Sequence, residues 1–248
     1  MTLSAGSLLK HGQYRIDEVL ACGGFGIVYR AIQTDLGLPI VLKTLKAEEP
    51  ALPLETLKER FLTEARRLMH LRHRHIVQVR DCFMEDGHPF MVMDFIPGFT
   101  LAQKIANGPL PAAEALRYIR QIGQALSFIH AQGLLHRDVK PSNIIVDERT
   151  QQAILIDFGI ARELSPQAPQ PNTGILSVGF AALEQYLPAH RWTAATDVYG
   201  LAATLYALIT GQTPESSVVR EQVGLREPHE LNPNSSPSLN QAILKGMA

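Results

Sequence analysis

The chain has 248 residues, of which 46% are hydrophobic and 19% charged, the composition of a globular domain rather than of a disordered chain. Its formal net charge of -1 argues against a protein held to nucleic acid by bulk electrostatics. Cys22 and Cys82 are too few for a disulfide framework, and the sequence shows no signal peptide or membrane-spanning apolar run. We therefore expect a cytoplasmic segment without membrane contact, with an anchor further along a longer protein left open.

The first part of the chain, 14–94, has the pattern of a β-rich region interrupted by one helix. Short β-type runs at 26–31, 40–45 and 90–95 are separated by Gly, Pro and polar turns. Between them, 57–69 carries apolar residues at helical spacing, which predicts a helix with one buried stripe. That stripe consists of Leu57, Phe61, Ala65 and Leu68, and Glu64 lies on it as well.

A helical region follows a break at 96–98, where Pro and Gly together end the preceding strand and predict a hinge. The segment 111–133 has one apolar helical face between a starting Pro and a terminating Gly. Residues 144–147 and 154–157 predict a short strand pair around a turn. The segment 198–210 is apolar on nearly every face, which predicts a helix buried on all sides.

A glycine-rich turn between two predicted strands is the first candidate site. Gly23, Gly24 and Gly26 would bring bare backbone N–H groups close to a ligand without obstruction by a Cβ atom. Such a loop can cover phosphates, although a glycine-rich hairpin that is only a turn is the alternative. A Walker A loop is excluded because no Gly-Lys-Ser/Thr follows.

A lysine in an apolar run and a carboxylate on an apolar stripe form the second candidate. Lys43 must reach solvent or an anion from its strand, and Glu64 needs a partner on its helix. Each satisfies the other if they meet. The alternative is an intrahelical pair of Glu64 with Arg60 or Arg67.

The segment 136–143, His-Arg-Asp-Val-Lys-Pro-Ser-Asn, is the most specific signal in the chain. Asp138 can accept a proton from a hydroxyl group, and Lys140 can neutralise a phosphoryl group in transfer. Asn143 offers an amide oxygen to a hard cation. The sequence Asp157-Phe158-Gly159 adds a second metal-seeking carboxylate one β-turn-β unit later.

In this order, the glycine-rich loop, strand lysine, helix glutamate, HRDxKxxN and DFG resemble the Hanks-type protein kinases. The stretches FLTEARRLMHLRHRHIV and DVYGLAATLYALITGQTP look like bacterial Ser/Thr members of that family. The resemblance implies an α+β, two-lobed protein kinase fold over 1–248. We expect a β-rich N-lobe at 1–95 and a mostly helical, incomplete C-lobe at 96–248.

The resemblance also implies transfer of the γ-phosphoryl group of ATP, with Mg²⁺, to Ser/Thr hydroxyls of proteins. Asp138 would act as the base, with Lys140 as the mark of a Ser/Thr kinase, and Lys43 would hold the nucleotide phosphates while paired with Glu64. The two metal ligands would be Asn143 and Asp157. The expected nucleotide site consists of Ala21, Cys22, Gly23, Gly24, Gly26, Val28, Val41, Lys43, Met93, Asp94, Ile96 and Ile145.

Regulation by autophosphorylation is a further implication, because Arg137 beside Asp138 is typical of kinases activated by a phosphorylated loop. Thr173 is the expected acceptor, with Ser165 and Ser177 as competitors. Ser177 matches the family threonine that contacts the catalytic Asp. Asp197 matches the carboxylate that braces the HRD segment, and it is also a good helix N-cap residue.

Several positions depart from the family pattern. Ala21 stands at the first Gly position, Leu183 replaces Pro in Ala-Leu-Glu, and Val41 replaces a small residue above adenine. Family members continue past residue 248, so we expect a C-terminally truncated domain in which Glu184 lacks its arginine partner unless water or Arg191 reaches it. A pseudokinase or nucleotide-binding scaffold, inactive because truncated, is the alternative, and a small-molecule phosphotransferase is a second.

Overall fold

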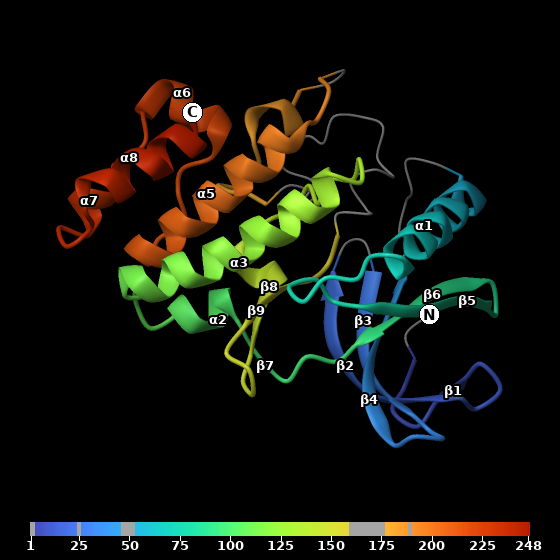
Figure 1. Ribbon diagram of the computed structural model, residues 1–248. Coiled ribbons are helices and arrows are strands. Elements are labelled where there is room, and N and C mark those ends of the chain that lie inside the picture. The colour runs from blue at the N-terminus through green and yellow to red at the C-terminus, as the bar shows by residue number, and fades with distance from the viewer. Residues whose placement is uncertain (1–2, 24–25, 46–52, 159–176, 188–189) are drawn as a thin grey trace. The chain divides into compact units, whose positions relative to one another are not determined.

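The computed structural model describes residues 3–23, 26–45, 53–158, 177–187 and 190–248. These residues form two compact units, one dominated by a β-sheet and the other by helices (Figure 1). The first unit comprises the described parts of Met1–His73 and Val77–Ile96. The second comprises the described parts of Arg74–Ile76, Pro97–Arg162 and Gln167–Ala248.

A six-stranded antiparallel sheet makes up most of the first unit, in the order β1-β2-β3-β4-β6-β5. The three predicted strands are confirmed as β3, β4 and β6. Strand β3 ends two residues later than the sequence pattern indicated, β4 and β6 begin two residues earlier, and β6 also ends one residue earlier. The bounds are β1 Leu8–Leu9, β2 Tyr14–Gly23, β3 Gly26–Gln33, β4 Leu38–Leu45, β5 Val79–Glu85 and β6 His88–Asp94.

The two faces of this sheet differ in burial. Alternation along β3 and β4 sends Ile27, Tyr29 and Leu42 to one face, where they join the hydrophobic core of the unit. Strand β6 is buried over five consecutive residues, which shows that both of its faces are covered. Helix α1, Leu54–Met69, packs against β5 and β6 and buries Phe61 and two further residues of the predicted stripe.

The second unit is mostly helical, with a small sheet in the order β7-β8-β9. Helix α5 lies at its centre and packs against α3 and α8. The bounds are β7 Gly98–Thr100, α2 Leu101–Ile105, α3 Ala112–His130, η1 Pro141–Asn143, β8 Ile144–Asp147, β9 Ala153–Leu155, η2 Leu183–Gln185, α5 Ala194–Thr210, α6 Ser217–Val223, α7 Pro228–Leu231 and α8 Pro237–Gly246.

Gly98 explains the chain break predicted after the β-rich region. Its φ is +155°, and a Cβ atom there would lie 2.0 Å from the Val146 carbonyl oxygen across the β7-β8 pair. A side chain is therefore incompatible with the close backbone approach that begins the small sheet.

Helix α5 confirms the prediction of an apolar helix that is buried nearly all round, because most of its residues from Thr196 to Thr210 are inaccessible. The proposed N-cap role of Asp197 is wrong. The cap is Thr193, whose hydroxyl accepts a hydrogen bond from Ala195 N–H at 3.2 Å. Both residue types are good caps, and the earlier one begins the helix, which leaves Asp197 inside its first turn.

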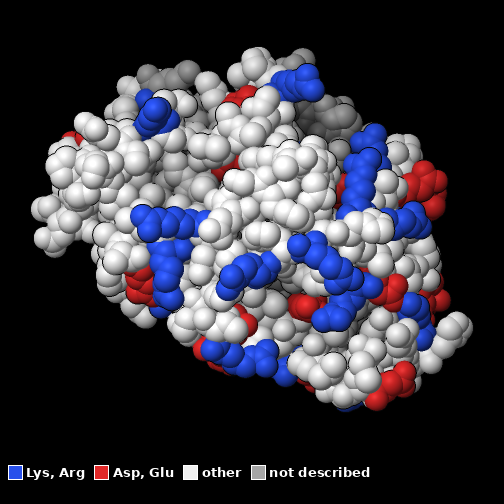
Figure 2. All heavy atoms as spheres, viewed as in Figure 1, with Lys and Arg blue, Asp and Glu red and all other residues white. Residues whose placement is uncertain are grey.

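Across the residues that the structure describes, none of the helices combines the length and apolar character needed to cross a bilayer. Basic and acidic side chains both occur on the face shown in Figure 2, in keeping with the net charge of -1.

Candidate active site

The segment 136–143 leads from the region after α3 into β8 and carries Asp138 and Lys140, two of the four predicted catalytic residues, together with the predicted metal ligand Asn143. Its second half turns in the short helix η1, where Pro141 has the fixed φ that suits a first helical position. Asn143 N–H donates to the Lys140 carbonyl at 3.0 Å and closes the turn. This turn brings the side chains of Lys140 and Asn143 into contact with the Asp138 carboxylate.

Asp138 is the centre of a hydrogen-bond network made of side chains predicted from the sequence. Its Oδ1 accepts from the Ser177 hydroxyl at 2.8 Å, and its Oδ2 accepts from Asn143 Nδ2 at 2.9 Å. The Lys140 ammonium lies 3.0 Å from Oδ2 and donates to Ser177 Oγ at 2.7 Å. The carboxylate is 16% exposed. Carboxylate, ammonium and hydroxyl groups are therefore within direct reach of one another.

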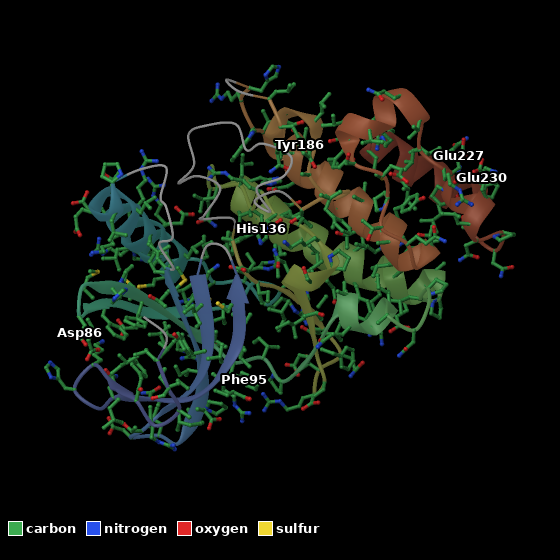
Figure 3. All side chains as sticks on the ribbon, turned by 180° about the vertical axis from the view of Figure 1, so that it is seen from behind. Asp86, Phe95, His136, Tyr186, Glu227 and Glu230 are labelled. Atoms are coloured by element: carbon green, nitrogen blue, oxygen red, sulfur yellow. The ribbon has the colours of Figure 1, made fainter. Side chains whose placement is uncertain are left out.

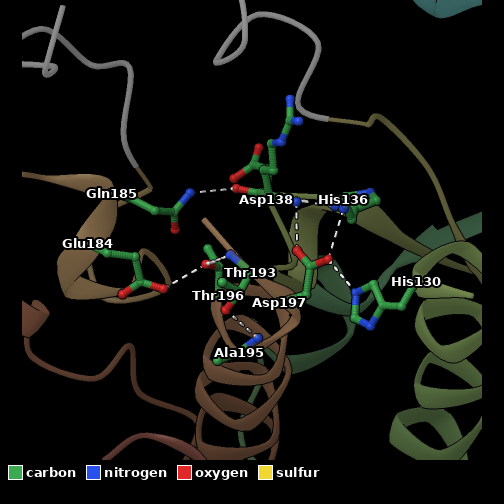
Figure 4. A network of polar contacts seen from close by, with 10 residues as sticks. His130, His136, Asp138, Glu184, Gln185, Thr193, Ala195, Thr196 and Asp197 are labelled. Carbon is green, nitrogen blue, oxygen red and sulfur yellow. Dashed lines mark hydrogen bonds and ion pairs between the residues drawn. The ribbon is translucent and has the colours of Figure 1, made fainter. Parts of the chain in front are cut away.

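Asp197 holds the segment from below, through a side chain with no exposed surface (Figure 4). It accepts backbone N–H bonds from His136 at 2.8 Å and from Arg137 at 2.6 Å, and a third bond from His130 Nε2 at 2.8 Å. Burial acts to raise the pKa of Asp197, but the bond from His130 and the other donors outweigh it and hold the pKa below its ordinary value. A charged carboxylate is thus maintained inside the protein.

His136, labelled in Figure 3, is fully buried in the second unit. Its hydrogen bonds hold it as a neutral ring. Its Nδ1 accepts from Asp138 N–H at 3.3 Å, so its Nε2 must carry the proton that bonds the Ile156 carbonyl at 3.0 Å. Burial lowers the pKa of His136, in keeping with that tautomer. The ring also contacts Phe158, with centroids 4.9 Å apart.

The two predicted metal ligands come from neighbouring backbone segments. Ile156 N–H donates to the Asn143 carbonyl at 2.9 Å, and Asp157 follows with a left-handed φ of +58°. Both hydrogens of the Asn143 amide are used by Asp138, at its carbonyl and its carboxylate, so the amide oxygen is the atom left for a cation. One amide oxygen and one carboxylate fit Mg²⁺, which commonly takes few protein ligands together with phosphate and water.

The sheet of the first unit places several predicted nucleotide residues on one face. Strand register pairs Val28 with Lys43, and Val41 with Met93. Val28, Val41 and Lys43 are half-buried and alternate with the core residues of β3 and β4, so they lie on the face opposite the core cluster. Met93 is 8% exposed.

The glycine-rich hairpin is described only in part, because Gly24 lies outside the described residues. Ala21, Cys22 and Gly23 are exposed at the end of β2, and Gly23 pairs with Gly26 across the turn. A Cβ atom at Gly26 would lie 2.2 Å from the Thr44 carbonyl oxygen. This glycine is therefore required for close packing of β3 on β4, whatever the loop binds.

The helix carboxylate Glu64 is 12% exposed and lies 3.5 Å from Arg67 Nη1, an i,i+3 pair on α1. This is one of the two intrahelical contacts weighed from the sequence, and the pairing of Glu64 with Lys43 stays a prediction. At the hinge, Asp94 donates its N–H to the Gln78 carbonyl at 3.0 Å and pairs its carboxylate with Arg80. Ile96 is half-buried.

Ile145 belongs to the small sheet, paired with Thr100 and Ile154, and is half-buried. Glu184, for which Arg191 or water was suggested as a partner, accepts from the Thr196 hydroxyl at 2.6 Å. Gly159 of the DFG sequence and the possible phosphorylation sites Ser165 and Thr173 lie outside the described residues.

Three residues around the catalytic segment were not singled out from the sequence. They are His130, which binds Asp197, and Gln185 and Trp192, which both contact Arg137. No local motif marks any of them, because each partner lies far away in the chain. A buried amide or an aromatic ring has no sequence pattern of its own when its contacts are long-range.

Comparison with known proteins assigns the family. Residues 14–240 match the protein kinase domain model. The chain is 34% identical to serine/threonine-protein kinase PknA of Mycobacterium tuberculosis, over 94% of this chain and 56% of the relative. It is 32% identical to serine/threonine-protein kinase pkn2 of Myxococcus xanthus, over 86% of this chain and 26% of the relative.

A solved structure agrees. The kinase domain of Mycobacterium tuberculosis PknI superposes with a TM-score of 0.76 at 25% identity, covering 100% of this chain and 92% of that one. The chain therefore belongs to the protein kinase family, with the two-lobed α+β fold that the motifs predicted. Kinases of this family use ATP together with Mg²⁺.

The resemblance to bacterial Ser/Thr kinases is confirmed by these relatives. The chain spans between a quarter and somewhat over half of the length of the curated relatives compared, 26% and 56%. What the whole protein does is therefore a matter for proposal.

Proposed function

We propose that this domain transfers the γ-phosphoryl group of ATP, with Mg²⁺, to Ser and Thr hydroxyls of proteins. The observation that carries the proposal is the environment of Ser177 Oγ, which donates to Asp138 at 2.8 Å and accepts from Lys140 at 2.7 Å. A hydroxyl held between a carboxylate and an ammonium can lose its proton to the first while the second offsets negative charge. An acceptor hydroxyl of a substrate needs the same two groups.

In the proposed mechanism, Asp138 orients the acceptor hydroxyl and takes its proton as the oxygen attacks the γ-phosphorus. The bond between that phosphorus and the β,γ-bridging oxygen breaks, and ADP leaves. Lys140 balances the charge that grows on the phosphoryl oxygens. Asn143 and Asp157 would hold Mg²⁺, which would offset the negative charge of the phosphates. Asp197 keeps the segment in place through the backbone of His136 and Arg137.

On the nucleotide side, Lys43 would bind the α/β-phosphates, supported by Glu64. Val28 and Val41 would contact the adenine ring from one side and Ile145 from the other, with Met93 behind it and the backbone of Asp94 and Ile96 at its polar edge. The alternation of β3 and β4 supports this, since it gives Val28, Val41 and Lys43 a common face. Ala21, Cys22, Gly23, Gly24 and Gly26 would cover the phosphates.

The proposed substrates are proteins, in keeping with Lys140 and with relatives named as serine/threonine-protein kinases. The domain itself would be one substrate, with Thr173 as the acceptor and Arg137 as the residue that pairs with the new phosphate. We place the reaction in the cytoplasm, where ATP is available. We also propose that the division near residue 95 separates the N-lobe from the C-lobe of a single kinase domain.

Phosphate transfer from radiolabelled ATP to a basic test protein checks the proposal. Asp138→Asn should reduce the rate by about 100-fold or more, because an amide cannot take the proton. Asp147→Asn is the matched control, because the Asp147 carboxylate accepts the Arg149 N–H at the end of β8 and lies 4.0 Å from Nε of the exposed Arg149 side chain. An amide oxygen can still accept that N–H. Labelled residues should be phosphoserine and phosphothreonine, without phosphotyrosine.

Binding of Mg²⁺-ATP to Asp138→Asn is measured by the thermal shift that the nucleotide causes. A variant that still binds the nucleotide is folded, so its loss of transfer is a loss of chemistry. Full transfer by Asp138→Asn would contradict the proposed base. Nucleotide binding without transfer in the unaltered chain would favour the scaffold alternative.

A further inference from the structure

Arg137, next to the proposed base, has an unusual backbone conformation. Its φ of +68° lies in the left-handed region, which is unfavourable for a residue with a side chain and persists only where neighbours impose it. Its N–H donates to Asp197 Oδ1 at 2.6 Å, and its carbonyl accepts from Gln185 Nε2 at 2.9 Å. Both backbone polar groups of Arg137 are thus fixed by side chains from other segments.

Gln185 uses both ends of its amide. While Nε2 binds the Arg137 carbonyl, Oε1 accepts the Ala182 N–H at 3.1 Å. The residue is 2% exposed, so neither bond can be replaced easily by water. Figure 4 shows the side chain reaching from the Ala182–Gln185 stretch toward the catalytic segment. Gln185 is therefore a direct link between these two parts of the second unit.

Trp192 joins the same two stretches through different atoms. Its ring lies 5.5 Å from the Arg137 guanidinium carbon, and its Nε1–H donates to the Glu184 carbonyl at 3.3 Å. The stretch Ala182–Gln185 therefore contacts the catalytic segment directly through Gln185 and indirectly through Trp192.

We propose that Gln185 is a positioning residue for phosphoryl transfer, which couples the Ala182–Gln185 stretch to Asp138 by holding Arg137 in its left-handed conformation. This inference rests on the proposed function and adds to it a residue that no motif of the chain assigns. The resemblance to protein kinases implies that the Ala-Leu-Glu stretch, 182–184, faces a protein substrate, so Gln185 would link a substrate bound there to the base. The coupling acts on the protein substrate rather than on the nucleotide.

Two substitutions separate the two bonds of Gln185. Gln185→Met keeps the length of the side chain and removes both hydrogen bonds. Gln185→Glu keeps an oxygen for Ala182 N–H but places the other oxygen against the Arg137 carbonyl, where it repels instead of donating. In both variants we expect kcat/KM for a peptide substrate to fall about tenfold or more, since a lost buried bond moves an equilibrium by about that factor. The KM for ATP should stay within about twofold.

Asn240→Leu is the matched control, because Asn240 is also a buried amide that bonds at both ends, accepting from His229 N–H at 3.2 Å and donating to Glu227 at 2.7 Å. Its loss should lower the melting temperature while kcat/KM of the folded protein stays unchanged. If the Gln185 variants behave like this control, Gln185 is only structural and the proposal is overturned. The proposal is likewise overturned if Gln185→Glu retains full kcat/KM, because the bond to Arg137 would then be dispensable.

Fluorescence provides a readout that does not depend on activity. Trp192 is the single tryptophan of the chain, and its ring lies against the Arg137 guanidinium. Gln185→Met should change its emission, and Asn240→Leu should not. Unchanged emission in Gln185→Met contradicts the link. If the unaltered chain transfers no phosphate, the proposed function fails, and the fluorescence comparison still decides whether Gln185 holds Arg137.

Discussion

Asp138 in the catalytic segment and Lys43 on β4 would take part in one reaction but are held in place by different interactions. Asp138 depends on side-chain hydrogen bonds and on a backbone that buried groups such as Asp197 fix from outside. Lys43 sits in a strand paired on both sides, with Val28 and with Met91. Its direction follows from the alternation of β4. The catalytic segment should therefore be sensitive to isosteric changes at remote positions, whereas the sheet face should tolerate replacement of the functional side chain itself.

The largest effect that we expect from this difference is a loss of activity without unfolding. Lys43→Met keeps the aliphatic stem in the sheet and removes the charge, so phosphate transfer should fall by about 100-fold or more. The free energy of unfolding should change by less than about 1 kcal/mol. Transfer assays and urea unfolding measure the two quantities.

Lys58→Met is the control, because Lys58 pairs at 2.7 Å with Glu55, an exposed residue in the first turn of α1. It should leave transfer intact. The contrast between the sheet face and the catalytic segment would be contradicted if Lys43→Met unfolded at a clearly lower urea concentration or kept normal transfer.

The second effect concerns the support of the catalytic segment. Asp197→Asn conserves shape but replaces a charged acceptor by a neutral amide that also carries hydrogens toward His136 and Arg137 N–H groups. We expect the free energy of unfolding to fall by about 2 kcal/mol, within the range for hydrogen bonds to buried charged groups. Transfer by the folded fraction should fall as well.

Asp17→Asn tests the same chemical change at the surface, where Asp17 is 40% exposed and lies 3.4 Å from Arg30. It should cost less than about 1 kcal/mol. An equal fall in the free energy of unfolding of the two variants, measured with urea, would show that the buried hydrogen bonds of Asp197 add no more stability than an exposed ion pair.

The sequence predicted the elements with strong periodicity. The stripe of α1, the one-sided α3 and the all-round apolar α5 follow from apolar spacing, and each is found with bounds close to the prediction. The N-cap of α5 was misassigned because Thr193 and Asp197 are both good cap residues. Long-range contacts decide between them, because the buried Asp197 carboxylate accepts from the His136 and Arg137 N–H groups instead of capping the helix.

The motifs of the sequence predicted which residues of the candidate site lie together, while the roles of those residues stay predictions. Asp138, Lys140 and Asn143 are close in sequence, and they meet in space. Gln185 was missed because its partner Arg137 is 48 positions away. The partner atom is a backbone carbonyl, which every residue has, so no residue pattern marks it. The left-handed φ of Asp157 was also invisible, since the conformation is imposed by the surrounding structure and not by the residue type.

The smallest effect in this comparison is a pH dependence of stability that belongs to the catalytic segment. His136 has a pKa lowered by burial from the ordinary value of 6.5, so the folded protein binds its proton less readily than the unfolded chain does. The contribution of the neutral ring to stability is therefore fully present above pH 6.5 and is lost as the pH falls from 6.5 toward the folded pKa. One such group gives a slope of at most about 1.4 kcal/mol per pH unit.

The measurement is urea unfolding between about pH 7.5 and about pH 5, a range chosen to span the titration of histidine but not that of Asp197. His136→Phe keeps a ring against Phe158 and has nothing to titrate, so its stability should fall less steeply in this range. Equal slopes would mean that His136 is not held neutral by the Asp138 N–H and the Ile156 carbonyl. The hydrogen bonds of the His136 ring would then belong to another tautomer or to the protonated ring. The contrast between the catalytic segment and the sheet face that carries Lys43 would rest on Asp197 and Gln185 alone.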